Sequence, residues 1–123
     1  MSSIVAWAGV GVVGAAGAYA RFALGGAVTA SRASDFPLGT FVVNVTGGFA
    51  LGLLVGLAVE GDARLVLGTG FLGAYTTFST WMVEAQRLGE DGDWATMWLY
   101  LLGSTAAGLA ATGAGWLLGE ALA

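Results

Sequence analysis

The polar side chains inside the apolar segments of this chain are few, and nearly all of them donate hydrogen bonds. The segment "GTFVVNVTGGF" places Thr40 and Asn44 one helical turn apart, on one face. Later segments add hydroxyl groups at Thr69, Tyr75, Thr76, Thr77, Ser79, Thr80, Tyr100, Ser104, Thr105 and Thr112. An unmatched polar group in hydrocarbon costs free energy, so these residues are the first candidates for function.

These side chains have two interpretations on sequence alone. A hydroxyl in a membrane helix often donates to a carbonyl one turn earlier, which is the simpler explanation for an isolated residue such as Thr105. Asn44 differs, because a carboxamide carries two donors that its own helix does not easily satisfy. It either bridges two helices or faces a solute.

The chemistry of this donor set favours an anion. No carboxylate falls inside the apolar segments, and the chain has no cysteine and no histidine. This argues against a proton-exchanging carboxylate, a divalent-cation cage and a thiolate metal site. An amide, several hydroxyls, one arginine and the positive edges of aromatic rings remain, and these groups suit a small anion.

The stretch "GAYTTFSTW", residues 73–81, is poor helix sequence within an apolar run. Gly73 has low helix propensity, and the β-branched residues Thr76 and Thr77 lose rotamer freedom in a helix. The stretch predicts a broken helix, with a kinked helix patched by its hydroxyls as the alternative. Where such breaks are buried in protein, their freed carbonyls commonly coordinate a monovalent cation.

Four long apolar segments position these residues, at about 4–29, 37–59, 65–83 and 95–119. Each approaches or exceeds the length of about 20 residues that crosses a bilayer. The chain is 57% hydrophobic and only 10% charged, and its carboxylates stand at segment edges. The segments lack the alternation of membrane β-strands. We therefore predict an all-α membrane protein, with four transmembrane helices in a single domain over residues 1–123.

Small residues and charges bear on how these helices assemble. Gly48, Gly52 and Gly56 form a ladder that lets helix backbones approach closely. Such packing leaves little room inside one subunit, so a pathway would run along a subunit interface.

The four predicted spans place Arg64 on one side of the membrane and Arg32 and Arg87 on the other. Such a weak bias permits both orientations, and hence an antiparallel dimer, or one weakly fixed orientation. The acidic third connection is either a solvated loop or an adaptation to high salt.

Three motifs together resemble the signature segments of the small fluoride channels called Fluc or CrcB. They are "GAYAR" (17–21), "GTFVVNVTGGFALG" (39–52) and "GFLGAYTTFSTW" (70–81). The resemblance covers the whole chain in length, four-helix layout and motif order. It implies an antiparallel, dual-topology dimer in the cell membrane, with two fluoride pores along its interface and a structural sodium ion at its centre. It implies passive export of cytoplasmic fluoride and no enzymatic activity.

The resemblance also implies a role for each matching position. The fluoride pore would be lined by Asn44, Thr40, Phe78, Trp81, Tyr100 and Ser104. Gly73 and Thr76 would offer backbone carbonyls to the sodium ion, and Arg21 would stand near the vestibule. Trp81 departs from the family pattern, in which the second ring is usually phenylalanine, and its indole adds an N–H donor. Ala74 is a second departure, since another glycine is common there.

Two other functions compete with a fluoride channel. A small multidrug exporter also has four short helices and dual topology, but it needs a membrane-embedded glutamate that the first segment lacks. A structural membrane subunit without transport is the second, and the polar cluster of Asn44 and residues 76–79 argues against it. The expected partners are fluoride, the lipid bilayer and a second subunit, either an identical copy or a related chain. No nucleic acid is expected.

Overall fold

The computed structural model describes residues 3–31 and 35–123, and every regular element in these ranges is a helix. Arg32, which entered the charge argument above, lies outside them. The elements in chain order are α1 (Ser3–Ser31), α2 (Leu38–Gly56), α3 (Gly61–Arg64), η1 (Leu65–Leu72), α4 (Gly73–Tyr75), α5 (Ser79–Glu90) and α6 (Trp94–Leu122).

Within the described ranges, α1, α2 and α6 are long and apolar enough to cross a membrane. They correspond to the predicted segments 4–29, 37–59 and 95–119. Pro37 immediately precedes α2, where a missing amide donor costs the helix nothing. The carboxylate of Asp93 caps α6 by accepting a hydrogen bond of 3.3 Å from the amide of Thr96.

The predicted segment 65–83 is divided in the structure. Helical structure runs without interruption from α3 through η1 to the end of α4 at Tyr75, and it resumes at Ser79. The element η1 is a π-helix, and the amide of Gly73 donates to the carbonyl of Gly68 five residues earlier. Residues 76–78 are not helical, and Thr76 is extended, with φ −83° and ψ 159°. Gly73 itself is helical, so the interruption lies after it.

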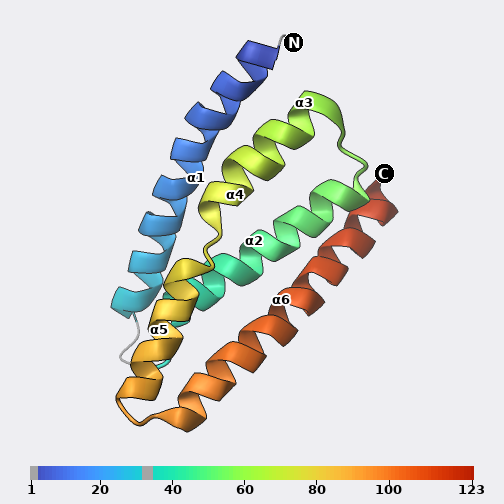
Figure 1. The fold of residues 1–123 in the computed structure, drawn as a ribbon. Coiled ribbons are helices and arrows are strands. Elements are labelled where there is room, and N and C mark those ends of the chain that lie inside the picture. The colour runs from blue at the N-terminus through green and yellow to red at the C-terminus, as the bar shows by residue number, and fades with distance from the viewer. Residues whose placement is uncertain (1–2, 32–34) are drawn as a thin grey trace.

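The helices form an elongated bundle in which α2 runs between α1 and α6 (Figure 1). α1 packs against η1 and α4, while α6 packs against α2 and α5. Both chain ends and α3 lie towards one end of the bundle, and the connection from α5 to α6 lies at the other (Figure 1). Residues 76–78 are therefore near the middle of the bundle, next to α2.

Glycines allow α2 and α6 to touch through their backbones. A Cβ atom on Gly52 would collide with the carbonyl oxygen of Thr112, and one on Gly56 with that of Trp116. On the other helix, a Cβ atom on Gly115 would collide with the α2 backbone. The close packing predicted from the glycine ladder is confirmed, and it fixes the separation of these two helices.

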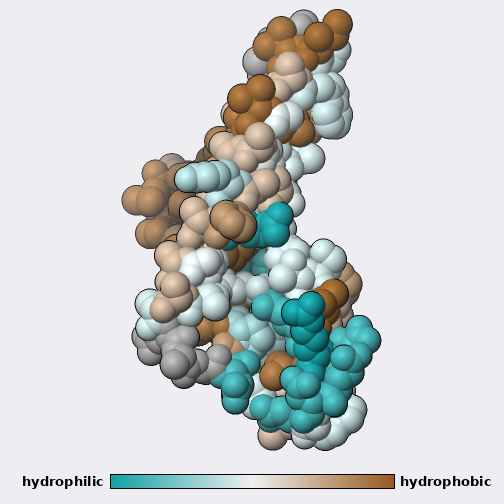
Figure 2. All heavy atoms as spheres, turned by 90° about the vertical axis from the view of Figure 1, so that its left-hand side faces the viewer, coloured by the Kyte–Doolittle hydropathy of each residue, from teal (hydrophilic) through white to brown (hydrophobic). Residues whose placement is uncertain are grey.

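Most large apolar side chains point outward from the single subunit. Few hydrophobic residues of the described ranges are buried, whereas side chains such as Val12, Phe22 and Leu109 are strongly exposed. Figure 2 shows hydrophilic residues gathered at one end of the visible face. The second half of α5 contributes exposed polar residues there, including Arg87 and Glu90. An apolar body with a polar end is the surface expected of a protein that sits in a bilayer.

Candidate functional site

The site centres on a double hydrogen bond between Asn44 and the backbone of Thr77. The side-chain Nδ2 of Asn44 donates to the Thr77 carbonyl at 2.8 Å, and the Thr77 amide donates to Asn44 Oδ1, also at 2.8 Å. One side chain of α2 thus satisfies both backbone polar groups of Thr77, which lies in the non-helical segment. Of the two interpretations of Asn44, the structure shows the bridge, and one of its two N–H groups remains for another acceptor.

Other side chains satisfy part of the remaining backbone around the interruption. The hydroxyl of Thr76 donates to the carbonyl of Leu72 at 2.9 Å, and Nε of Arg21 donates to the carbonyl of Ala74 at 3.2 Å. Within the part of the chain that the structure describes, no hydrogen bond reaches the carbonyl oxygens of Gly73, Tyr75 or Thr76. The interruption is therefore held open by α1 and α2, with backbone oxygens left as free acceptors.

Glycine in α2 allows this segment to lie directly against the helix. Gly47 follows Asn44 by about one turn, and a Cβ atom there would collide with the methyl group of Thr76. The hydroxyl of Thr46 lies 2.7 Å from that of Tyr75, which anchors the end of α4 to the same helix. The sequence "NVTGG" thus supplies the bridging amide, the anchor and the space that the interruption needs.

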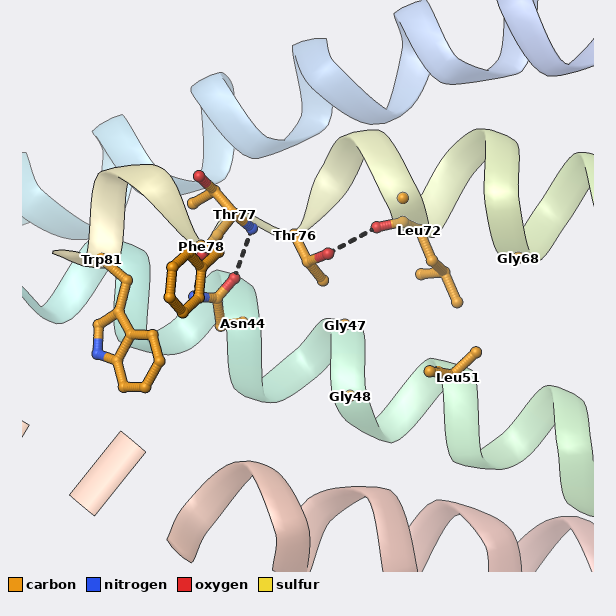
Figure 3. Close-up of a pocket in the computed structure, with 11 residues that line it drawn as sticks. Asn44, Gly47, Gly48, Leu51, Gly68, Leu72, Thr76, Thr77, Phe78 and Trp81 are labelled. Carbon is orange, nitrogen blue, oxygen red and sulfur yellow. Dashed lines mark hydrogen bonds between the residues drawn. The ribbon is translucent and has the colours of Figure 1, made fainter. Parts of the chain in front are cut away.

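A groove of about 400 Å³ runs along this contact, and we call it the Asn44 groove. Its lining residues include Asn44, Gly47, Gly73, Thr76, Phe78 and Trp81. Figure 3 shows the ring of Phe78 beside the Asn44 side chain, with Trp81 extending from α5 on the same side. The Phe78 and Trp81 rings meet edge to face, with centroids 5.8 Å apart. The structure brings together the predicted amide and both predicted rings.

A second groove, of about 420 Å³, opens between α1, α2 and the start of α5, and we call it the Arg21 groove. Arg21 lines it together with Thr40, Thr77 and Thr80. None of its lining residues is acidic, so the guanidinium of Arg21 gives it a positive charge. Arg21 and Thr40, to which the resemblance gives roles in a vestibule and in the pore, therefore line the same groove, and Phe78 does not line it.

A third groove, of about 290 Å³, is formed by α2, α5 and α6, and we call it the Ser104 groove. Asn44, Trp81 and Ser104 line it, together with apolar and hydroxyl residues of α6 such as Leu109 and Thr112. Asn44 and Trp81 also line the Asn44 groove, so the two grooves share residues. Ser104 is thereby placed with predicted site residues from two other helices.

Tyr100 contacts other residues of the predicted set but does not line the grooves. Its side chain is fully buried and lines none of the three grooves. Its ring packs edge to face against Phe36 and Trp81, at centroid distances of 5.3 and 6.5 Å. Its hydroxyl donates to Oε1 of Glu84 at 3.0 Å. In the single subunit Tyr100 joins α5 to α6.

Glu84 and the Thr77 peptide are the site elements that sequence reasoning missed. Glu84 stands at the charged edge of an apolar run, but α5 continues past it to Glu90, so its carboxylate reaches Tyr100. It also lines a groove of about 200 Å³ at the polar end, with Asp35, Arg87 and Asp91. The helical spacing from Trp81 through Ala85 to Leu88 was the available signal for this longer helix. No local signal marks a backbone peptide such as that of Thr77.

The two residues predicted to hold a cation lie at the interruption. Gly73 is exposed in the last helical turn before it, and Thr76 is its first residue. The described ranges contain no cluster of His, Cys, Asp or Glu that could hold a metal ion. Any cation here would depend on backbone oxygens.

Known proteins resemble this chain over most of its length. A family model described as "CrcB-like protein, Camphor Resistance (CrcB)" matches residues 8–116. A protein of Mycolicibacterium paratuberculosis named fluoride-specific ion channel FluC 2 is 52% identical over 91 residues, covering 74% of this chain and 75% of the relative. The FluC 2 proteins of Mycobacterium bovis and Haloarcula marismortui are each 46% identical. The first match covers 98% of this chain and 93% of the relative, and the second covers 87% of each.

Proposed function

Because the chain belongs to the CrcB family, whose curated relatives are named fluoride-specific ion channels, we propose that it is a fluoride-selective channel. It is a multi-pass membrane protein with long apolar helices, and its family is one of ion channels and not of enzymes. We propose further that residues 65–83 form a fourth crossing, broken at residues 76–78, and that this break carries the conduction site.

The observation that carries the proposal is the chemistry of the three grooves that meet around Asn44 and Thr77. Amide, hydroxyl, indole and guanidinium groups line them, and none of their lining residues is acidic. The carboxylates of Asp35, Glu84 and Asp91 line a separate groove at the polar end. Hydrogen-bond donors with no carboxylate among the lining residues favour an anion over a cation.

Size gives the basis for selecting fluoride among anions. Fluoride is small and strongly hydrated, so a narrow dry path must replace its water with donors at short range. Asn44 retains an N–H group, and Phe78 presents a ring whose edge carries partial positive charge. Chloride is too large to sit well among donors spaced for fluoride. Transport is passive: hydrogen fluoride enters a cell as a neutral acid and dissociates, and the trapped anion leaves down its electrochemical gradient.

Liposomes test this function directly. We expect the purified protein, reconstituted in liposomes loaded with fluoride or chloride, to release fluoride and retain chloride when a counter-ion path is opened. A fluoride electrode and a chloride electrode measure the two rates. Fluoride release no faster than from protein-free liposomes, with folded protein present in the membrane, would refute the proposal.

The exposure of the site supports a second subunit. Phe78 is 69% exposed in the single chain, and Gly73 is exposed beside it. A dry path needs a wall over these residues, and a second copy in the opposite orientation supplies one, as the weak arginine bias permits. A related chain with the same interface would serve equally.

A sodium ion at the centre of this dimer fits the residues present. The carbonyl oxygens of Gly73 and Thr76 have no hydrogen bond within the described ranges, and oxygens freed at a broken membrane helix suit a monovalent cation. Gly73 and Thr76 of each subunit would hold the ion. The bound ion would supply positive charge that fixes the two breaks relative to each other.

Experiments on the chain expressed alone test both the antiparallel dimer and the sodium site. We expect terminal tags on the chain expressed alone to appear on both faces of the membrane, and the purified protein to run as a dimer. Replacing sodium by a larger organic cation during purification should lower both the dimer fraction and fluoride release. A single orientation would contradict the antiparallel arrangement, and indifference to the replacement would contradict the sodium site.

A further inference from the structure

Four aromatic rings make successive edge-to-face contacts that end at the interruption. The ring of Phe36 meets that of Tyr100, with centroids 5.3 Å apart and planes at 83°. Tyr100 meets Trp81 at 6.5 Å and 82°, and Trp81 meets Phe78 at 5.8 Å and 79°. We call these four residues the ring series. Edge-to-face contact is a preferred geometry of aromatic pairs, so each ring favours one orientation of the next.

Phe36 begins the ring series and is held by its backbone and by a further ring. Its carbonyl accepts a hydrogen bond of 2.7 Å from the amide of Leu38, and Pro37 between them has φ −72° and ψ 72°. These angles are those of an inverse γ-turn. The ring of Phe41 on α2 packs edge to face against that of Phe36, at 5.6 Å. The Phe36 ring is therefore fixed by a tight turn and by contacts with both α2 and α6.

The middle of the ring series belongs to a packed core. Tyr100 is fully buried and forms a cluster with Ala85 and Leu88 of α5. Phe36 and Trp81 are half-buried, and both pack against this cluster. Because a close-packed interior leaves few voids, the loss of one side chain displaces its neighbours. A change at Phe36 therefore reaches Trp81 through Tyr100.

Phe78 ends the ring series with little other support in the single subunit. Its side chain is 69% exposed, and it belongs to the non-helical residues 76–78. The edge of an aromatic ring carries partial positive charge and its face partial negative charge, so only the edge attracts an anion. The contact with Trp81 therefore influences which part of the Phe78 ring faces the Asn44 groove.

We propose that Phe36 is a positioning residue for fluoride conduction: through the ring series, it holds the orientation of the Phe78 ring at the Asn44 groove. This inference rests on the proposed channel function. Phe36 lines none of the three grooves around the interruption, so its effect on an ion is indirect. Its chain neighbours Asp35 and Pro37 line the groove at the polar end. The ring series thus connects the polar end of the bundle with the interruption.

A ¹⁹F resonance of Phe78 provides a direct test. The chain contains six phenylalanines, so protein labelled with 4-fluorophenylalanine and placed in lipid nanodiscs gives six signals, and Phe78→Ile identifies one by its loss. We expect Phe36→Leu to shift the Phe78 signal, and Phe36→Tyr, which keeps a ring, to leave it in place. In a Trp81→Leu background the ring series is already interrupted, so Phe36→Leu should no longer move the signal.

Fluoride release from liposomes gives the second readout. Phe36→Leu should lower release about fivefold, in line with the loss of one edge-to-face ring pair, and Phe36→Tyr should release fluoride at close to the original rate. Phe36→Met is a second variant without a ring and should behave like Phe36→Leu. Phe49→Leu is the matched control, since Phe49 is also half-buried and lines none of the named grooves, and it should conduct normally.

The inference is overturned if Phe36→Leu and Phe36→Met conduct like the original chain, or if the Phe78 signal stays in place when Phe36 loses its ring. A signal that still moves in the Trp81→Leu background also overturns it, because the effect would not pass through the ring series. Absence of release by the original chain is a different result and refutes the channel function. The Phe78 signal still decides the positioning role in that case, because it needs no transport.

Discussion

Asn44→Ala is expected to lower fluoride release roughly 100-fold, because it removes an amide that holds the Thr77 peptide by two hydrogen bonds. Each partner left without a bond in a dry site costs about 1 to 3 kcal/mol, and about 2.8 kcal/mol corresponds to a hundredfold change. The same change should lower the melting temperature of the purified protein. Release from liposomes and thermal melting in detergent measure the two effects.

Two further variants test the hydrogen bonds of Asn44 and the effect of a negative charge at this position. Asn44→Asp keeps an acceptor for the Thr77 amide but loses the donor and adds negative charge, so it should block fluoride with a smaller loss of stability. Gln86→Ala is the matched control, because it removes an exposed amide that donates a hydrogen bond to Glu90, and it should change neither quantity. Fluoride release within twofold of the original rate for Asn44→Ala would refute the role of the bridge.

Phe78→Ile is expected to lower fluoride release at least about tenfold while the fold and the dimer persist. The ring is 69% exposed in the single subunit, so folding depends little on it, whereas isoleucine offers no electropositive edge to an anion. Size-exclusion chromatography measures the oligomeric state, and the electrode measures release. Trp98→Ile removes another exposed aromatic ring that lines none of the grooves, and it should conduct normally. Undiminished release by Phe78→Ile would remove that ring from the pathway.

Hydropathy alone predicted four apolar segments, and three of them are continuous long helices in the structure, α1, α2 and α6. It failed to predict the full extent of α5, which continues beyond the first charge to Glu90 because its buried face continues through Ala85 and Leu88. Charge marks the edge of an apolar run, but side-chain periodicity and packing decide where a helix ends.

The position of the interruption depends on contacts that local sequence does not show. Propensity points to the stretch 73–81 as a whole, and within it Gly73 is helical whereas residues 76–78 are not. The Thr77 peptide has its partner in Asn44, which lies far earlier in the chain. A local sequence pattern identifies a stretch of low helix propensity, but the tertiary contact with Asn44 determines which residues of that stretch are not helical.

The candidate site shows the same division between residue type and placement. Donor chemistry and the family resemblance pointed to Asn44, Phe78, Trp81 and Ser104, and the structure groups these residues around two adjoining grooves. Tyr100 has an equally suitable hydroxyl, but Phe36, Trp81 and Glu84 enclose it. A hydroxyl predicts what a side chain can do, and its neighbours decide whether an ion reaches it.

The backbone contact of α2 with α6 sets the distance between the two helices that carry part of the site. Asn44 and Ser104 project from these two helices, whose separation is set by carbonyls resting on Gly52 and Gly115 and not by the donors themselves. The residues that set the helix separation are therefore different from the residues that donate hydrogen bonds. Donors can be exchanged in this protein without resetting the width between the helices, and the width can be altered by a methyl group placed far from any ion.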